Sequence, residues 1–374
     1  MKKLLAGIAL GFVASVAIVS VAHLARGHGR PHTRLVAEDA SAPLSRVAIH
    51  YAPVSDRVAL GVWRQLFAVL PASVDVQVEV TQQADFDRLM KLLRASHTPN
   101  LDRMHPVIVG APITTWSRDR YAALVTDSGA GEILAPPRIE TPFVGRAGDA
   151  RSPGAISQAL YHHDPRIANI VFEGGDLAAT PHFVFADVNL QARNLGRTEA
   201  DRPSIEHELH ARFDQELVWL GDAVGDVPRH HIMMYMVPLD DHTIAVGDPR
   251  AGVALLATEP AGAGLPLDDL ETEAKRFDHA AEQLAARGFK IVRVPALVLA
   301  GAGSYVTYTN ALFDRHGSTR VVYLPTYSLP ALDAAAKQFY EAQGFEVHPI
   351  DVTSIYRLNG SLGCLVNVLA REQP

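Results

Sequence analysis

Two stretches of the chain repeat the same order of local features. FDHAAEQLAARGFKIVRVPAL begins at residue 277, and LDAAAKQFYEAQGFEVHPIDV begins at residue 332. Each passes through Asp, paired Ala and Gln to Gly-Phe and then into an apolar run that ends near Pro, with a one-residue gap between the two. A recurring unit of helix, Gly and strand indicates an internally repeated α/β architecture. Any two αβ units also share some of these features, so a chance likeness stays open at this point.

The rest of the chain alternates in the same way. From about residue 46, short runs rich in Val and Ile, such as RVAIHYAPV, VDVQVEV and YAALVTD, stand between amphipathic segments and are bounded by Pro, Asp or Ser. Such runs predict strands. Residues 268–287 carry apolar side chains at helical spacing, and Gly288 follows where a helix C-cap belongs. No low-complexity segment or long linker divides residues 46–374. We therefore predict one α/β domain over residues 46–374.

The N-terminus predicts export or membrane attachment. Two lysines precede LLAGIALGFVASVAIVSVA, which carries no charge. This run is long for a signal peptide and close to the roughly 20 residues of a spanning helix, so residues 1–26 are either a signal peptide or a membrane anchor. An anchor would associate with the membrane through residues 4–22. Residues 27–45 are rich in Gly, Pro, His and Ser and are expected to form a flexible tether. The domain is then exported, either periplasmic or anchored to the inner membrane outside the cytoplasm.

Charge and motif content exclude several classes of function. The net charge of −7 leaves no basic field for nucleic acid and is compatible with a small cationic ligand. Neither a P-loop nor a dinucleotide Gly-x-Gly-x-x-Gly follows a strand, which argues against nucleotide binding. The adjacent His230 and His231 would point to opposite faces of a strand, and no His or Cys set has zinc spacing. We therefore expect neither a metal nor an organic cofactor.

Four short motifs place polar groups where a strand or a tight turn would otherwise be apolar. They are TTWSRDRY at 114–121, FEGGDL at 172–177, HHIMMYMVPLDDHTIAVGDP at 230–249 and NGSLGCLVNVL at 359–369. Each motif alone has an ordinary structural explanation, which is a surface ion pair, a hairpin turn, a structural histidine and a small buried thiol, respectively. The last motif holds the only cysteine, so its thiol has no internal disulfide partner.

The order of the four motifs resembles that of the guanidino-group-modifying superfamily, which includes agmatine deiminase, arginine deiminase, peptidyl-arginine deiminase and the amidinotransferases. TTWSRDRY resembles its Trp-x-Arg-Asp segment and FEGGDL its Glu-Gly-Gly-Asp segment. HHIMMY resembles its His-x-Asp segment, and NGSLGC resembles its Gly-Gly-x-x-His-Cys segment. The resemblance implies the pentein fold, an α/β-propeller of five pseudo-repeated ββαβ-like units, preceded here by the N-terminal hydrophobic segment. It also implies a deiminase that converts a guanidino group to a ureido group with loss of ammonia.

The chemistry explains why these residue types recur. A guanidinium is a planar cation whose N–H groups form a fixed fork, so carboxylates bind it bidentately. A thiolate then attacks its central carbon, and a histidine protonates the departing nitrogen and activates water. The resemblance implies Cys364 as nucleophile, His231 as general acid/base, and Glu173 as the carboxylate that contacts the substrate and orients the histidine. It implies substrate binding by Asp119, Trp116, Arg118 and the residue at position 233.

Position 233 departs from the pattern, because Met233 replaces the second aspartate of His-x-Asp. Losing one charge-assisted pair costs about 1.5–3 kcal/mol, or one to two decades in affinity. Three explanations stay open. The substrate is a modified or less polar guanidine, a nearby carboxylate (Asp240, Asp241 or Asp248) substitutes, or the protein binds a cationic ligand or partner without catalysis. Agmatine-type and arginine-type substrates, including arginine-containing peptides, remain open, and an amidinotransferase is a third class. The oligomeric state is not predicted.

Overall fold

A computed structural model describes residues 33–137, 146, 148–198, 200–262, 264–301 and 304–372. The described strands form five sheets. In the order in which their strands pair, the sheets are β18 (Val366–Arg371), β2 (Leu44–Tyr51), β3 (Asp75–Val80) and β4 (Met104–Ile108); β1 (Thr33–Leu35), β5 (Ala122–Thr126), β6 (Gly131–Ala135) and β7 (Arg166–Ile167); β10 (Glu216–Leu220), β9 (Phe183–Asp187) and β8 (Ala178–Ala179); β11 (Met236–Pro238), β12 (Thr243–Asp248), β13 (Lys290–Leu299) and β14 (Ser304–Thr307); and β15 (Leu312–His316), β16 (Thr319–Thr326) and β17 (Phe345–Asp351).

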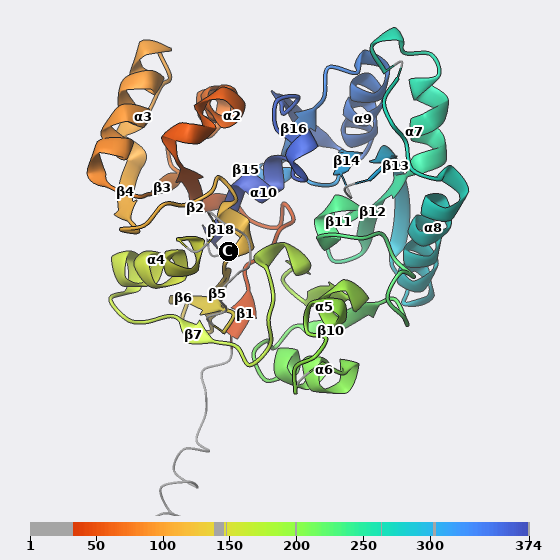
Figure 1. The fold of residues 1–374 in the computed structure, drawn as a ribbon, viewed down its shortest axis with the longest axis horizontal. Coiled ribbons are helices and arrows are strands. Elements are labelled where there is room, and N and C mark those ends of the chain that lie inside the picture. The colour runs from red at the N-terminus through yellow and green to blue at the C-terminus, as the bar shows by residue number, and fades with distance from the viewer. Residues whose placement is uncertain are drawn as a thin grey trace, which may run out of the picture.

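The helices lie between the strands in sequence and mostly at the outside of the molecule (Figure 1). They are α2 (Asp56–Val69), α3 (Gln83–Ala95), α4 (Ser152–Tyr161), α5 (Val188–Arg193), α6 (Arg202–His210), α7 (Pro249–Leu256), α8 (Leu270–Ala286), α9 (Pro330–Ala342) and the short α10 (Leu362–Leu365). Single 3-10 turns are η1 (Pro53–Ser55), η2 (Leu101–Arg103), η3 (Ser117–Asp119), η4 (Asp149–Arg151), η5 (Gly174–Asp176), η6 (Ile232–Met234), η7 (Pro260–Gly262) and η8 (Tyr356–Leu358).

Each sheet contains an antiparallel pair and a parallel pair that share one strand. The antiparallel pairs are β18–β2, β5–β6, β8–β9, β11–β12 and β15–β16. The parallel pairs are β2–β3, β6–β7, β9–β10, β12–β13 and β16–β17. Parallel neighbours need a crossover connection, and at least one helix lies between the two strands of each parallel pair. In four of the five described sheets the chain therefore runs in the order strand, strand, helix and strand, whereas in the fifth the first of these strands, β18, comes from the C-terminal end of the chain.

The two similar stretches of sequence occupy equivalent places in this pattern. The first forms most of α8 and then β13, and the second forms α9 and then β17. After each helix the chain turns at a glycine in the left-handed region, Gly288 with φ +94° and Gly344 with φ +82°. Only glycine adopts this conformation without strain, so Gly-Phe follows both helices for the same reason. The predicted helix and strand pairs are confirmed.

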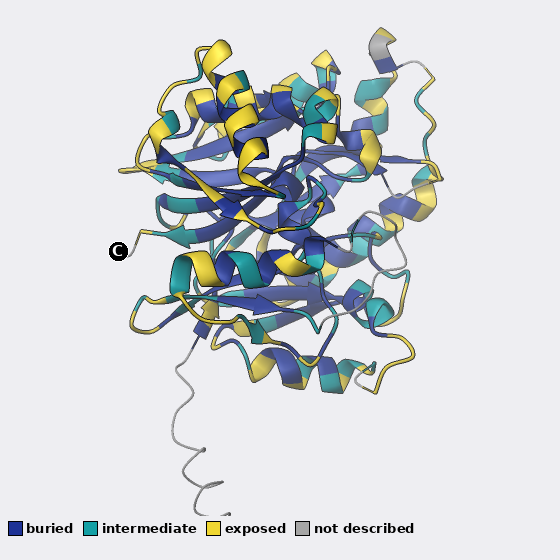
Figure 2. Cartoon of the chain, turned by 60° about the vertical axis from the view of Figure 1, so that its left-hand side comes forward, coloured by how far each residue is buried: buried dark blue, intermediate teal, exposed yellow. Residues whose placement is uncertain are grey.

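The sheets bury their faces under the helices, and exposed residues gather on the outer helix surfaces (Figure 2). The main hydrophobic cluster runs through most of the chain, from β2 and α2 to β18. A smaller cluster joins β5 and β6 with β9, α6 and β10. Both begin before residue 46, because Leu35 and Val36 are buried in them. The core thus includes part of the segment that composition assigns to a tether.

The prediction of a flexible tether over residues 27–45 is wrong for the part that the structure describes. β1 pairs antiparallel with β5, and the backbone N–H of Glu38 donates to the carbonyl of Ala179 at 2.8 Å. The side chain of Glu38 forms an ion pair with Arg118 at 2.6 Å. Although the segment has the average composition of a linker, its short apolar stretch and Glu38 fix it to the domain. Residues 1–32, which include the predicted signal or anchor, lie outside the described residues. Among the residues that are described, no helix has the length and apolarity of a membrane span.

Candidate active site

Each of the four motifs contains a short helix that comes just before a strand. η3 precedes β5, η5 precedes β8, η6 precedes β11 and α10 precedes β18. Each of these strands pairs antiparallel with the strand that the antiparallel and parallel pairs of its sheet share, and we call it the entry strand of that sheet. The four entry strands belong to four different sheets. The short helices also meet, since α10 packs against η3, η3 against η5, and η5 against η6. Four motifs that are far apart in the sequence therefore share one place in the fold.

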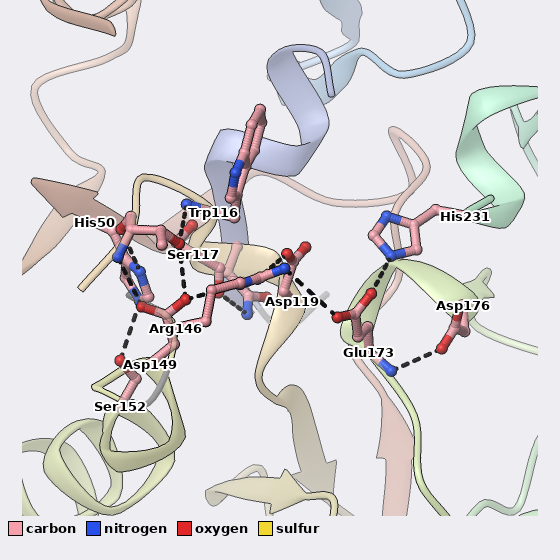
Figure 3. Close-up of polar contacts among 12 residues, drawn as sticks. His50, Trp116, Ser117, Asp119, Arg146, Asp149, Ser152, Glu173, Asp176 and His231 are labelled. Carbon is pink, nitrogen blue, oxygen red and sulfur yellow. Dashed lines mark hydrogen bonds and ion pairs between the residues drawn. The ribbon is translucent and has the colours of Figure 1, made fainter. Parts of the chain in front are cut away.

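Glu173 and His231 form the central contact of this region. The Nε2 atom of His231 lies 2.9 Å from Oε2 of Glu173 (Figure 3). Glu173 is fixed at its own backbone, where its N–H donates to Asp176 at 2.7 Å in a capping box. The imidazole lies directly over Gly175, because a Cβ added there would be 2.5 Å from Cγ and Nδ1 of the ring. The glycine of the Glu-Gly-Gly-Asp motif thus provides the space that the histidine occupies.

Asp119 joins this pair from η3. One oxygen of Asp119, one of Glu173 and one nitrogen of His231 lie within 4.8 Å of one another. The side chains of Asp119 and His231 are buried, and Glu173 is partly exposed. Three of the residues that the sequence predicts for the site are therefore brought together, from three separate motifs.

Two arginines that sequence reasoning missed bind the same carboxylates. Arg193, at the end of α5, lies 3.1 Å from Glu173 and 2.8 Å from Asp176. Arg146 forms an ion pair with Asp119 and lies 3.8 Å from Glu173 (Figure 3). Neither arginine belongs to one of the four motifs, and a lone arginine outside a motif gives no signal in a single sequence. The contacts of these arginines with the carboxylates join residues between 17 and 27 positions apart, so only the fold reveals them.

The electrostatics of the cluster favour a charged histidine beside a charged glutamate. Burial alone would favour the neutral ring, but the Cys364 side chain, the Glu173 hydrogen bond and the charge of Asp119 raise the pKa of His231 well above its usual 6.5. Burial likewise opposes the charge of Glu173, yet His231, Arg193 and Arg146 lower its pKa. Burial and the nearby Glu173 raise the pKa of Asp119. His231 is therefore protonated near neutral pH, the form that donates a proton.

Cys364 lies in α10 with 2% of its surface exposed. The side chain of Cys364 is a hydrogen-bond partner of His231, and this contact raises the pKa of the ring. Its backbone N–H donates to Oδ1 of Asn310 at 3.2 Å, and its Sγ lies 3.6 Å from the same oxygen. Asn310 precedes β15, the entry strand of the fifth sheet, so all five sheets contribute a residue beside their entry strand to this region. Sequence reasoning did not single out Asn310, although SYVTYTN lies within the resemblance.

The remaining predicted site residues have other surroundings. The guanidinium of Arg118 is buried and already has partners. It forms an ion pair with Glu38 and donates to the carbonyl of Leu177 at 3.0 Å. The role in substrate binding expected for Arg118 stays a prediction, and Glu38, the partner of this arginine, lies in the segment that was assigned to a tether. Trp116 is partly buried and its ring lies against Gly360. Met233 is buried in the hydrophobic core, and its carbonyl accepts from Thr309 at 2.9 Å.

None of the three carboxylates proposed to substitute at position 233 lies with the cluster. Asp240 accepts from the N–H groups of residues 242 and 243 in a turn. Asp241 pairs with His182 at 2.6 Å. Asp248 caps α7 by accepting from the N–H of Ala251 at 3.0 Å. A further carboxylate whose charge acts on His231 is Asp176, whose oxygens bind the Glu173 backbone and Arg193.

The adjacent histidines differ in charge and are not on a strand. His230 has a positive φ of 79°, and its ring meets that of His231 edge to face at 4.4 Å. The argument that they point to opposite faces of a strand is therefore wrong. Burial and the neighbouring His231 lower the pKa of His230 to about 3, so this ring stays neutral at the pH where His231 is charged.

Asp119, Glu173 and His231 present two carboxylates and an imidazole, a donor set that can bind a divalent cation. Two features of the same residues work against it. A metal-binding imidazole must be neutral, whereas His231 has a raised pKa. The carboxylates are also already paired with Arg146 and Arg193, whose charges repel a cation. The cluster therefore fits proton transfer and guanidinium binding better than metal binding.

No family model and no curated protein matches the sequence. The structure does resemble solved structures. C. jejuni agmatine deiminase has a TM-score of 0.63 at 16% identity over 91% of this chain and 98% of that chain. A cysteine-to-serine variant of it with substrate bound has a TM-score of 0.65 at 17% identity, with the same coverage. Agmatine deiminase of Enterococcus faecalis has a TM-score of 0.65 at 13% identity, over 92% and 98%. The mixed α/β fold of this chain is therefore the fold of the pentein deiminases.

Proposed function

We propose that the protein is a deiminase that hydrolyses a guanidino group to a ureido group and ammonia through a covalent adduct on Cys364. The observation that carries the proposal is the convergence of Asp119, Glu173 and His231 beside Cys364. The similarity to agmatine deiminase structures supports this class of reaction, and it makes agmatine the first substrate to test.

Each step follows from the chemistry of the cluster. Asp119 and Glu173 bind the planar cation through its N–H groups and keep its central carbon electrophilic. The Cys364 thiolate attacks that carbon, and the C–N bond breaks as His231 donates its proton to the leaving nitrogen, which departs as ammonia. The neutral His231 then takes a proton from water as the water attacks the same carbon. The C–S bond breaks, the ureido product leaves, and thiolate and protonated histidine are restored.

The positions of the acid and the base follow from local contacts. The Glu173 bond at 2.9 Å orients the ring and keeps it protonated before the first step. The charged ring in turn stabilises the thiolate, because a nearby imidazolium lowers the free energy of the sulfur anion. Asn310 holds the backbone of the nucleophile through its Oδ1. No step requires a metal or an organic cofactor.

The recurrence of strand, strand, helix and strand supports the further proposal that the five sheets are five pseudo-repeated units of an α/β-propeller. On this view the site residues are equivalent positions beside the entry strands of the five units. The catalytic-type domain would then span residues 46–374 together with the strand β1 that precedes it. We also propose export, either by a cleaved signal or by an anchor in residues 1–26, which the uncharged apolar run supports.

The test is ammonia release by the purified protein from agmatine, arginine, methylated arginine and an arginine-containing peptide. The matched control is Cys364→Ser, which changes one atom of a buried side chain. Release that disappears in the control is the expected result, and the substrate released fastest identifies the class. Absence of release from all four by folded protein would contradict the proposal. That outcome would favour a pentein that binds a cationic ligand or partner, for which Met233 and the paired state of Asp119 already give grounds.

A further inference from the structure

Arg146 has three carboxylate partners. Its Nη2 pairs with Oδ2 of Asp119, its Nη1 lies 3.8 Å from Oε1 of Glu173, and its Nε lies 3.2 Å from Oδ2 of Asp149. About a fifth of the side chain is exposed. Figure 3 shows Arg146 against Asp119 and reaching toward Glu173, with the imidazole of His231 on the far side of Glu173. The group therefore makes its contacts inside the candidate site and not on the open surface.

The two terminal nitrogens of Arg146 contact the two carboxylates that the proposed function assigns to the substrate. A substrate guanidinium is the same chemical group, with the same planar fork of N–H donors. A second guanidinium at this pair of carboxylates would be repelled by the charge of Arg146 in a partly buried site. Arg146 therefore competes with a substrate guanidinium for the charge of Asp119 and Glu173.

The position of Arg146 is supported by a buried anchor. Asp149 is fully buried and accepts at 2.7 Å from both the backbone N–H and the hydroxyl of Thr114. The carbonyl of Thr114 also accepts a hydrogen bond from Nδ1 of His50 at 3.0 Å. Asp149 thus has a fixed place in the structure and holds the Nε end of the arginine.

We propose that Arg146 is a specificity-determining residue that competes with a substrate guanidinium for the charge of Asp119 and Glu173. Small guanidines with no other anchoring group then bind weakly, and a substrate needs further contacts to compete. This inference rests on the proposed function, because it takes Asp119 and Glu173 as the substrate carboxylates. Met233 acts in the same direction, since it supplies no charge to attract a second cation.

The test is the Kd of agmatine by calorimetry on the Cys364→Ser background, with and without Arg146→Ala. Removing the internal competitor should tighten binding about tenfold or more, the factor that corresponds to one charge-assisted pair. The matched control is Arg151→Ala, which removes an exposed arginine close in sequence whose guanidinium donates to the carbonyl of Gly110 at 3.4 Å. It should leave the Kd unchanged. If Arg146→Ala is not folded by circular dichroism, Arg146→Met carries the same test with more of the apolar contact kept.

An unchanged or weaker Kd in the folded Arg146 variant, or no agmatine binding by either protein, would overturn the inference. Ammonia release by the proteins that retain Cys364 tests the proposed function separately. Tighter agmatine binding without ammonia release would support the role of Arg146 and contradict the deiminase. Ammonia release with no effect of Arg146→Ala on the Kd would do the reverse.

Discussion

Gly175 is the position at which the effect of a substitution on the geometry of the site can be estimated most directly. In the structure the His231 ring lies where a side chain at this position would be, with the added Cβ 2.5 Å from Cγ and Nδ1. Carbon atoms in contact lie about 3.5 Å apart, so Gly175→Ala must displace the ring by about 1 Å. That displacement must lengthen or bend the 2.9 Å hydrogen bond between His231 and Glu173. A displacement of this size costs about 100-fold in the rate of a step that the residue catalyses, and overpacking costs about 1–3 kcal/mol of stability.

The assay has two readouts and a matched control. The kcat for ammonia release should fall about 100-fold in Gly175→Ala, and the NMR titration of His231 should show a lower pKa, because the ring moves away from Glu173. Gly61→Ala makes the same chemical change within α2, where an added Cβ meets nothing within 4 Å. That control should keep its kcat and gain about 0.5–1 kcal/mol in the free energy of unfolding. A Gly175→Ala protein with wild-type kcat and an unshifted His231 pKa would refute this account of the cluster.

Two further predictions concern titratable groups. Glu173→Gln removes the anion that keeps His231 charged, so NMR should show the pKa of His231 falling, and the upper limb of the pH–rate profile should move to lower pH; an unchanged titration would mean that Glu173 does not set this pKa. Burial raises the pKa of Asp187 to about 7, against about 4 in the unfolded chain, so the folded state holds an extra proton and stability falls as pH rises from about 4 to 7. Asp187→Asn should remove up to about 4 kcal/mol of that fall, measured by urea unfolding at pH 4.5 and pH 8, and equal pH dependence in both proteins would contradict it.

Sequence periodicity was sufficient for the architecture where the local signals agree. The α8 to β13 and α9 to β17 units follow from helical spacing, a left-handed glycine and an apolar strand, which are all short-range features. The segment before residue 46 was misassigned because its average composition is that of a linker. Its contacts with β5 and with Arg118 are long-range and depend on the completed sheet.

The candidate site, too, could be predicted from the sequence only in part. Asp119, Glu173, His231 and Cys364 lie in motifs whose order is informative, and the structure brings the first three together and sets His231 beside the thiol. Arg146 is one arginine in a segment without a pattern. Arg146 is important because its charge lies against two carboxylates that the fold brings together from two separate motifs, and sequence spacing cannot encode that. The same holds for Arg118, because the motif names the residue and does not show that its guanidinium pairs with Glu38.

The central claim is that Cys364 is a nucleophile beside a guanidinium-binding site, and its alkylation rate tests this most directly. The measurement compares a haloacetamidine, which carries the cationic planar group, with the neutral haloacetamide, by mass spectrometry of the peptide that contains Cys364. The account predicts faster labelling by the amidine, slowed by agmatine and by Glu173→Gln. Equal and slow labelling by both reagents until the protein is unfolded would contradict it and would leave the thiol a buried structural side chain.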